Sequence, residues 1–99
     1  MELKRPAVVG TLESSDVMVA LRPNPEGGIR LELNSVVSAI FGNAIRKTAL
    51  DVLAEFRVEN AVVEINDRGA LDPVIRARMQ AAVCRAAGIR YDWTKEDRR

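Results

Sequence analysis

Two short segments of this chain have the period-two pattern of β-strands, and a run of turn-forming residues separates them. Residues 16–21 and residues 29–33 each direct alternate apolar side chains to one face. Between them, residues 23–28 read Pro-Asn-Pro-Glu-Gly-Gly, a composition that sets turn dihedral angles. The pattern predicts a β-hairpin with a long loop. Residues 7–11 and residues 61–65 are expected to form two further short strands.

Two other segments repeat apolar residues with the period of an α-helix. The first follows Asn34 or Ser35, either of which can cap it, and its apolar positions extend from Val36 to Phe56. The second is predicted to have Asp72 as its N-cap with Pro73 at the first helical position, and to end at Gly88. Its buried face is expected to contain Ile75, Met79, Ala82, Val83 and Ala86.

The order of these elements is β-β-β-α-β-α, which predicts a small single α+β domain with a mainly antiparallel sheet packed against two helices. A chain of 99 residues suits one domain, and we assign that domain to residues 1–90. Residues 91–99 are mostly charged and are expected to form a flexible tail. Within this tail, the rings of Tyr91 and Trp93 can fold back or dock on a partner.

The composition excludes several classes of function. With 15 basic and 14 acidic side chains the net charge is only +1, so the chain lacks the positive excess that drives nonspecific binding to nucleic acid. No apolar run approaches the roughly 20 residues needed to span a bilayer. No apolar segment follows the N-terminal basic pair, as a signal peptide would require. We therefore expect a cytoplasmic protein that binds neither nucleic acid nor membrane.

The residues needed for catalysis are also scarce. The chain has no histidine and a single cysteine, Cys84, which falls in the second helical segment and is expected to be a small buried or half-buried hydrophobe. Carboxylates do not cluster at ligand spacing, so a metal site is not expected. A glycine-rich phosphate loop is lacking as well. The side chains of Arg46, Arg76 and Arg78 are expected to lie on solvated helix faces. By itself the chain is not expected to be an enzyme.

Residues 10–16, Gly-Thr-Leu-Glu-Ser-Ser-Asp, place two adjacent hydroxyls between two carboxylates. A serine with no base beside it is a poor catalytic nucleophile. It is, however, well placed for modification by another protein. The carboxylates of Glu13 and Asp16 can keep the segment solvated, and a Ser-Ser-Asp run favours a surface turn. The residues alone fit either an ordinary turn or a modification site.

Residues 7–18 resemble the family of citrate lyase acyl carrier proteins, the gamma subunits of that complex. The resemblance covers nearly the whole chain. It continues through residues 41–46, 50–54, 69–72, 75–78 and 85–88. It implies that the serine after Thr-x-Glu, here Ser14, carries a phosphodiester-linked phosphoribosyl dephospho-CoA group whose thiol holds the acyl group. The next family position is often glycine and is Ser15 here, so Ser15 is the alternative hydroxyl, although the spacing favours Ser14.

The resemblance also implies partners. A non-catalytic carrier of this family presents acetyl and citryl thioesters to transferase (alpha) and lyase (beta) subunits during cleavage of citrate to acetate and oxaloacetate. A prosthetic-group transferase and an acetate ligase would act on it. We expect Glu13 and Asp16 to serve modification and docking and to contribute little to the fold; the alternative for Asp16 is structural, with its side chain capping the turn. Two alternatives stay open, the acyl carrier subunit of malonate decarboxylase and an unmodified interaction module.

Overall fold

The computed structural model describes residues 1–90, so the expectations for residues 91–99, including those for Tyr91 and Trp93, lie outside the described residues. Four strands and two helices form a small α+β domain in the predicted order. They are β1 (Ala7–Gly10), β2 (Val17–Arg22), β3 (Ile29–Ser35), α1 (Ser38–Glu55), β4 (Ala61–Asp67) and α2 (Asp72–Ala87). None of the described helices is long and apolar enough to cross a membrane.

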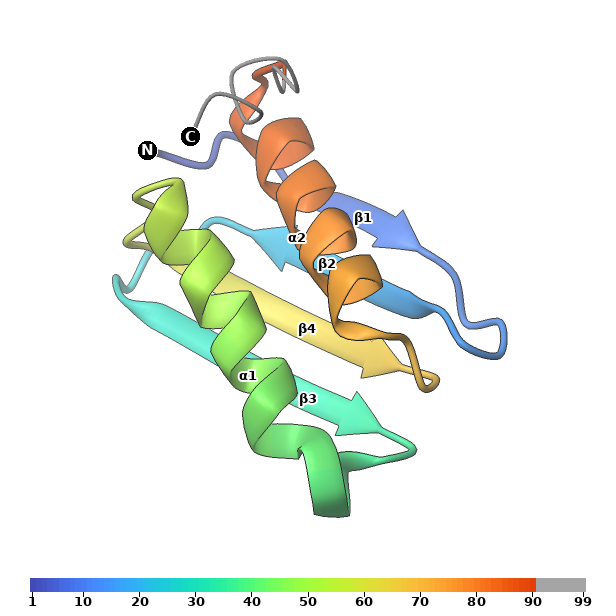
Figure 1. The fold of residues 1–99 in the computed structure, drawn as a ribbon. Coiled ribbons are helices and arrows are strands. Elements are labelled where there is room, and N and C mark those ends of the chain that lie inside the picture. Colours follow the sequence, from blue (N-terminus) through green and yellow to red (C-terminus); the bar gives the residue numbers. More distant parts are fainter. Residues whose placement is uncertain (91–99) are drawn as a thin grey trace.

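The strands form one mixed sheet with the spatial order β1-β2-β4-β3. Both helices cover the same face of this sheet (Figure 1). The strand pairs β1–β2 and β2–β4 are antiparallel, whereas β3 runs parallel to β4. Two antiparallel pairs against one parallel pair confirm a mainly antiparallel sheet.

The prediction that β2 and β3 pair as a hairpin is wrong, because β4 lies between them. The connection 23–28 crosses the start of β4 instead of reversing beside β2. The amide of Gly28 donates to Asn60 Oδ1 (2.9 Å), and the amide of Ala61 donates to Gly28 O (3.0 Å). Side-chain burial explains the order. Five of the seven residues of β4 are buried, whereas no residue of β3 is, so β4 occupies the interior of the sheet and β3 its edge.

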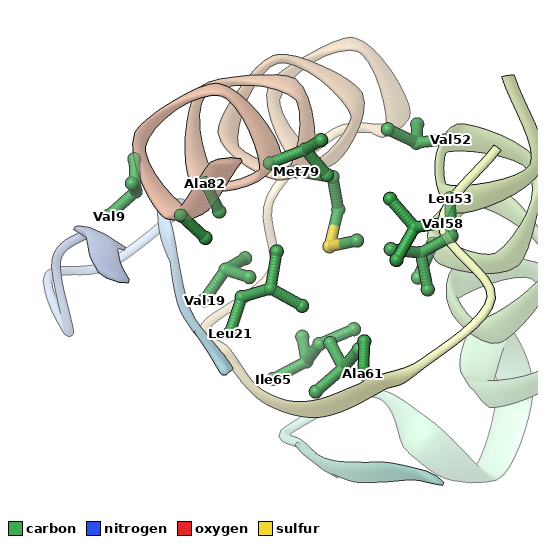
Figure 2. Packing of buried hydrophobic residues seen from close by; sticks show 14 of the residues in the cluster. Val9, Val19, Leu21, Val52, Leu53, Val58, Ala61, Ile65, Met79 and Ala82 are labelled. Carbon is green, nitrogen blue, oxygen red and sulfur yellow. The ribbon is translucent and has the colours of Figure 1, made fainter. Parts of the chain in front are cut away.

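The core lies between the sheet and the two helices. Figure 2 shows Met79 of α2 reaching between the strands and α1, and this side chain has no exposed surface. The five apolar residues predicted for the buried face of α2 are all buried, and so is Cys84. The φ of +70° at Gly88 confirms the left-handed end of this helix.

The starts of both helices differ from the prediction. Ser35 is the last residue of β3, and α1 begins three residues later at Ser38 without a side-chain cap. The Ser35 hydroxyl instead donates to Asp67 Oδ2 (2.7 Å) and accepts from the amide of Val37 (3.1 Å). Asp72 is the first residue of α2 and not its N-cap, because its carboxylate accepts a hydrogen bond from the Thr48 hydroxyl of α1.

The apolar pattern of α1 is only partly buried. Val52 and Leu53 are buried, whereas Val36, Ile40 and Phe41, near the start of the helix, are exposed. The strand β4 also continues through Asn66 and Asp67, two residues beyond the predicted strand 61–65. Both β3 and β4 are thus longer than predicted, and both extend toward the end of the sheet where the serine segment lies.

Candidate functional site

The serine segment forms the loop between β1 and β2. It lies at the end of the sheet where β3 and β4 also finish, and the segments 35–37 and 68–71 connect strand to helix at this same end (Figure 1). Three connections that are far apart in the sequence therefore lie at one end of the sheet, and the segment 68–71 is the one hydrogen-bonded to the serine loop among the described residues.

Hydrogen bonds within the loop hold it in one conformation. The Thr11 hydroxyl donates to Asp16 Oδ2 (2.6 Å) and accepts from the amide of Glu13 (3.2 Å). The amide of Asp16 donates to Glu13 O (3.1 Å), which closes a four-residue turn from Glu13 to Asp16. Ser14 and Ser15 are the two central residues of this turn. The hydroxyl pair is thus displayed on a fixed backbone.

Two backbone hydrogen bonds join the turn to the end of β4. The amide of Ser15 donates to Arg68 O, and the amide of Arg68 donates to Asp16 O, both at 2.9 Å. Arg68 thus bonds to two successive residues of the turn, Ser15 and Asp16, just beyond the last β2–β4 partners Val17 and Asp67. The position of the serine turn is therefore set by the sheet and not by the loop alone.

Asp16 is the electrostatic centre of the loop. Its carboxylate accepts from Thr11, from the amide of Val17 (2.7 Å), and from Arg78 of α2 through Nε (3.2 Å) and Nη2 (3.0 Å). These hydrogen bonds favour the charged form and lower the pKa of Asp16 to about 2, the Thr11 bond being the largest cause. Only 16% of the Asp16 side chain is exposed. The expectation that Asp16 contributes little to the fold is wrong, because its side chain holds the loop to α2.

Two of the arginines expected on solvated helix faces are ion-paired. Arg78 contacts Asp16, and Arg76 donates to Glu55 Oε1 at 2.7 Å. A helical periodicity does not reveal such a partner, since Asp16 and Arg78 are 62 residues apart. The one available signal was the resemblance at residues 75–78, which includes Arg78.

The two serines differ in their backbone and not in their exposure. Both side chains are exposed, and neither hydroxyl is hydrogen-bonded to any part of residues 1–90. The φ of Ser15 is +65°, in the left-handed region that glycine adopts most readily, which explains why glycine is suited to this position. Ser14 lies between Glu13, also exposed, and this constrained residue. An exposed hydroxyl without an internal partner fits a covalently attached group.

Other chemistry is scarce in the described part of the chain. Residues 1–90 contain no group of three His, Cys, Asp or Glu side chains placed to hold a metal ion. Burial raises the pKa of the Cys84 thiol, which disfavours the reactive thiolate. The loop 11–16 presents two adjacent exposed hydroxyls, and Arg68, Arg78 and Asp67 are the supporting residues that sequence reasoning missed.

Comparison with known proteins identifies a family model and close relatives that match this chain. Residues 4–86 match the acyl carrier (ACP) family described as malonate decarboxylase delta subunit (MdcD). The citrate lyase acyl carrier protein of Clostridium perfringens is 50% identical over 94% of this chain and 93% of its own length. That of Escherichia fergusonii is 58% identical over 88% of this chain and 90% of its own.

A solved structure supports the fold. One chain in the crystal structure of a Pseudomonas malonate decarboxylase hetero-tetramer in complex with malonate superposes with a TM-score of 0.55. The two chains are 22% identical, and the match covers 87% of this chain and 92% of the other. At that identity the likeness concerns the fold alone. The identities of 50% and 58% over most of the length carry the assignment, and the chain belongs to the family of citrate lyase acyl carrier proteins.

Proposed function

We propose that this chain is the acyl carrier subunit of citrate lyase and that it carries acetyl and citryl thioesters on a phosphoribosyl dephospho-CoA group linked to Ser14. The identity to citrate lyase acyl carrier proteins over nearly the whole chain carries this proposal. The exposed Ser14 on a turn held by Thr11, Asp16 and Arg68 supports it. As a member of this family the chain is a carrier and not a catalyst.

The chain's own residues present the attachment point. Attachment forms a bond between Ser14 Oγ and phosphorus, and the hydroxyl proton and the donor's leaving group depart. The prosthetic group supplies the thiol that holds the acyl group. Because the arm is tethered, the thioester stays at high effective concentration near each partner. The fixed turn then serves to keep Ser14 accessible to the protein that modifies it.

The partners follow from the same proposal. A transferase subunit exchanges acetyl for citryl on the carrier, a lyase subunit cleaves the citryl group, and a prosthetic-group transferase and an acetate ligase prepare the arm. Glu13, exposed beside Ser14, is proposed to take part in docking. Asp16 can do so only through the part of its side chain that Arg78 and Thr11 leave open. A cytoplasmic location stays a prediction.

The malonate decarboxylase carrier is the second candidate, because the matching family description names that complex. Substrate exchange separates the two. Acetylated carrier, mixed with purified citrate lyase subunits and citrate, is expected to support oxaloacetate release. Support of malonate decarboxylation, and not of citrate cleavage, would favour the second candidate.

Intact mass and peptide mapping test the attachment site. Carrier purified from its native host is expected to exceed the mass of the chain by one prosthetic group, located on Ser14. The Ser14→Ala variant should lose this mass and keep its fold, because an exposed serine changes stability by no more than about 0.5 kcal/mol. The matched variant Ser15→Ala should retain the mass. Added mass on Ser15, or none at all, would overturn the assignment.

The isolated carrier is expected to have no citrate-cleaving activity. Cleavage needs groups that bind and polarise the citryl substrate, and the proposal assigns these to the partner subunits. Oxaloacetate formation by the pure chain, after removal of every other subunit, would contradict this division of labour.

A further inference from the structure

A shallow cavity of about 180 Å³ opens beside the serine loop. It is lined by Leu12, Asn34, Val36, Asn66, Asp67 and Arg68. Asn34 and Asn66 are register partners in the parallel pair β3–β4, so their side chains leave the sheet side by side. Leu12 belongs to the serine loop itself. The cavity is therefore bounded by the serine loop, the end of β3 with Val36, and the end of β4 with Arg68.

The cavity is rich in free hydrogen-bond donors. Among residues 1–90, the side chains of Asn34, Asn66 and Arg68 make no hydrogen bond or ion pair. The one acid of the lining, Asp67, is already engaged. Its side chain is buried, with 2% exposed, and accepts from Ser35 Oγ (2.7 Å) and from the amide of Ala70 (2.9 Å). Two amides and a guanidinium thus face solvent without an internal acceptor.

Arg68 is tied to the serine turn through its backbone. Its carbonyl accepts from the amide of Ser15, and its amide donates to Asp16 O. Ser14 directly precedes Ser15, so these bonds hold the backbone of Arg68 close to Ser14. The nearby Arg78 is occupied by Asp16. Arg68 is therefore the unpaired cation next to the turn among the described residues.

We infer that this cavity binds the phosphate oxygens of the group attached to Ser14, with Arg68 as the counter-charge and Asn34 and Asn66 as neutral donors. The inference rests on the proposed function. A guanidinium donates to two phosphate oxygens at once, and the amides can satisfy those that remain. The charges support this assignment. A phosphodiester on Ser14 adds a negative charge next to the exposed carboxylate of Glu13, and the guanidinium of Arg68 would offset that charge. Binding would hold the attached end of the arm against the sheet while leaving the thiol end free.

The main comparison is between three carriers that bear the prosthetic group, after intact mass has located the group on Ser14, and Arg68→Lys is added as a rescue variant. They are wild type, Arg68→Gln and the matched control Arg22→Gln. Arg22 is also exposed and without a partner among the described residues, but it lies at the opposite end of β2. Thermal melting verifies that each variant is folded. If Arg68→Gln fails to fold, the double variant Asn34→Ala/Asn66→Ala replaces it.

The readout is ³¹P transverse relaxation of the serine-linked phosphodiester. In wild type and in Arg22→Gln the phosphorus should relax at the rate of the folded domain, and high salt should slow this relaxation by screening the contact. In Arg68→Gln it should relax slowly at every salt concentration, as in a mobile chain. Arg68→Lys should recover part of the wild-type rate, since lysine keeps the charge and lacks the bidentate geometry.

The outcomes distinguish the inference from the proposed function. Added mass on Ser14 together with equal relaxation in wild type and Arg68→Gln would overturn the cavity and leave the carrier role intact. Absence of the mass on Ser14 would overturn both. Dephospho-CoA added to the unmodified chain should not shift the side-chain signals of Arg68 or Asn66, because the contact depends on covalent tethering. A shift at low concentration would show that the cavity binds the free nucleotide and would contradict the dependence on tethering.

Discussion

Gly10 precedes the serine loop at a position where any side chain would collide with the neighbouring strand. Its φ is +95°, and a Cβ atom built on it would lie 1.9 Å from the carbonyl oxygen of Val17 and 3.0 Å from the carbonyl carbon. These are backbone atoms that no rotamer change can move. The Gly10→Ala variant must therefore shift β1 away from β2 where Gly10 pairs with Met18.

The expected cost of Gly10→Ala has two parts. A non-glycine residue in the left-handed region costs about 1–2 kcal/mol, and forcing extra volume into packed structure costs about 1–3 kcal/mol. We expect Gly10→Ala to lower the free energy of unfolding by about 2–5 kcal/mol. For a domain of this size, that corresponds to a drop in Tm of roughly 10 °C or more.

Gly88→Ala is the matched control for this experiment. Gly88 also has a positive φ, +70°, but a Cβ atom there would meet nothing within 4 Å. The free energy of unfolding of Gly88→Ala should therefore fall only by the conformational cost, about 1–2 kcal/mol. Urea unfolding followed by circular dichroism measures both variants. If the two losses agree within about 0.5 kcal/mol, a difference too small for a backbone collision, the steric argument is refuted.

Three further predictions concern the core, the loop charge and the docking residue. Met79→Ala removes a side chain with no exposed surface and should cost about 2–5 kcal/mol in urea unfolding; a loss below about 1 kcal/mol would contradict the packing described. Asp16 has its pKa lowered from 3.8 to about 2. Its contribution to stability is thus fully present above pH 3.8 and is lost as the pH falls through about 2. In Asp16→Asn, the free energy of unfolding should depend less on pH in this acidic range. An unchanged pH dependence in the variant would exclude a stabilising role for Asp16. Glu13→Lys should leave Tm unchanged and slow prosthetic-group transfer most at low ionic strength, where exposed charges are least screened. The control is Glu26→Lys, which reverses an exposed charge in the connection 23–28 and should leave the transfer rate unaffected. Equal transfer rates for the two variants would show that Glu13 has no role in docking.

Local patterns determined which elements form. The i, i+4 spacing of Ile75, Met79 and Val83 indicated the buried face of α2, and Gly88 indicated its end, because both signals depend on residues within a few turns of one helix. The polarity of residues 13–16 likewise indicated an exposed turn. The resemblance selected Ser14 within that turn. These inferences needed no knowledge of which elements become neighbours.

The tertiary structure decided which elements pair and what supports the site. Periodicity could not show that β4 lies between β2 and β3. An alternating strand can pair with several partners, and the partner is selected by how well the complete sheet buries its apolar face. The Asp16–Arg78 pair, the buried Asp67 and the placement of Arg68 beside Ser14 join residues more than 30 positions apart. Such contacts produce no periodic pattern in the sequence, because they depend on which strands and helices lie next to one another in the folded domain.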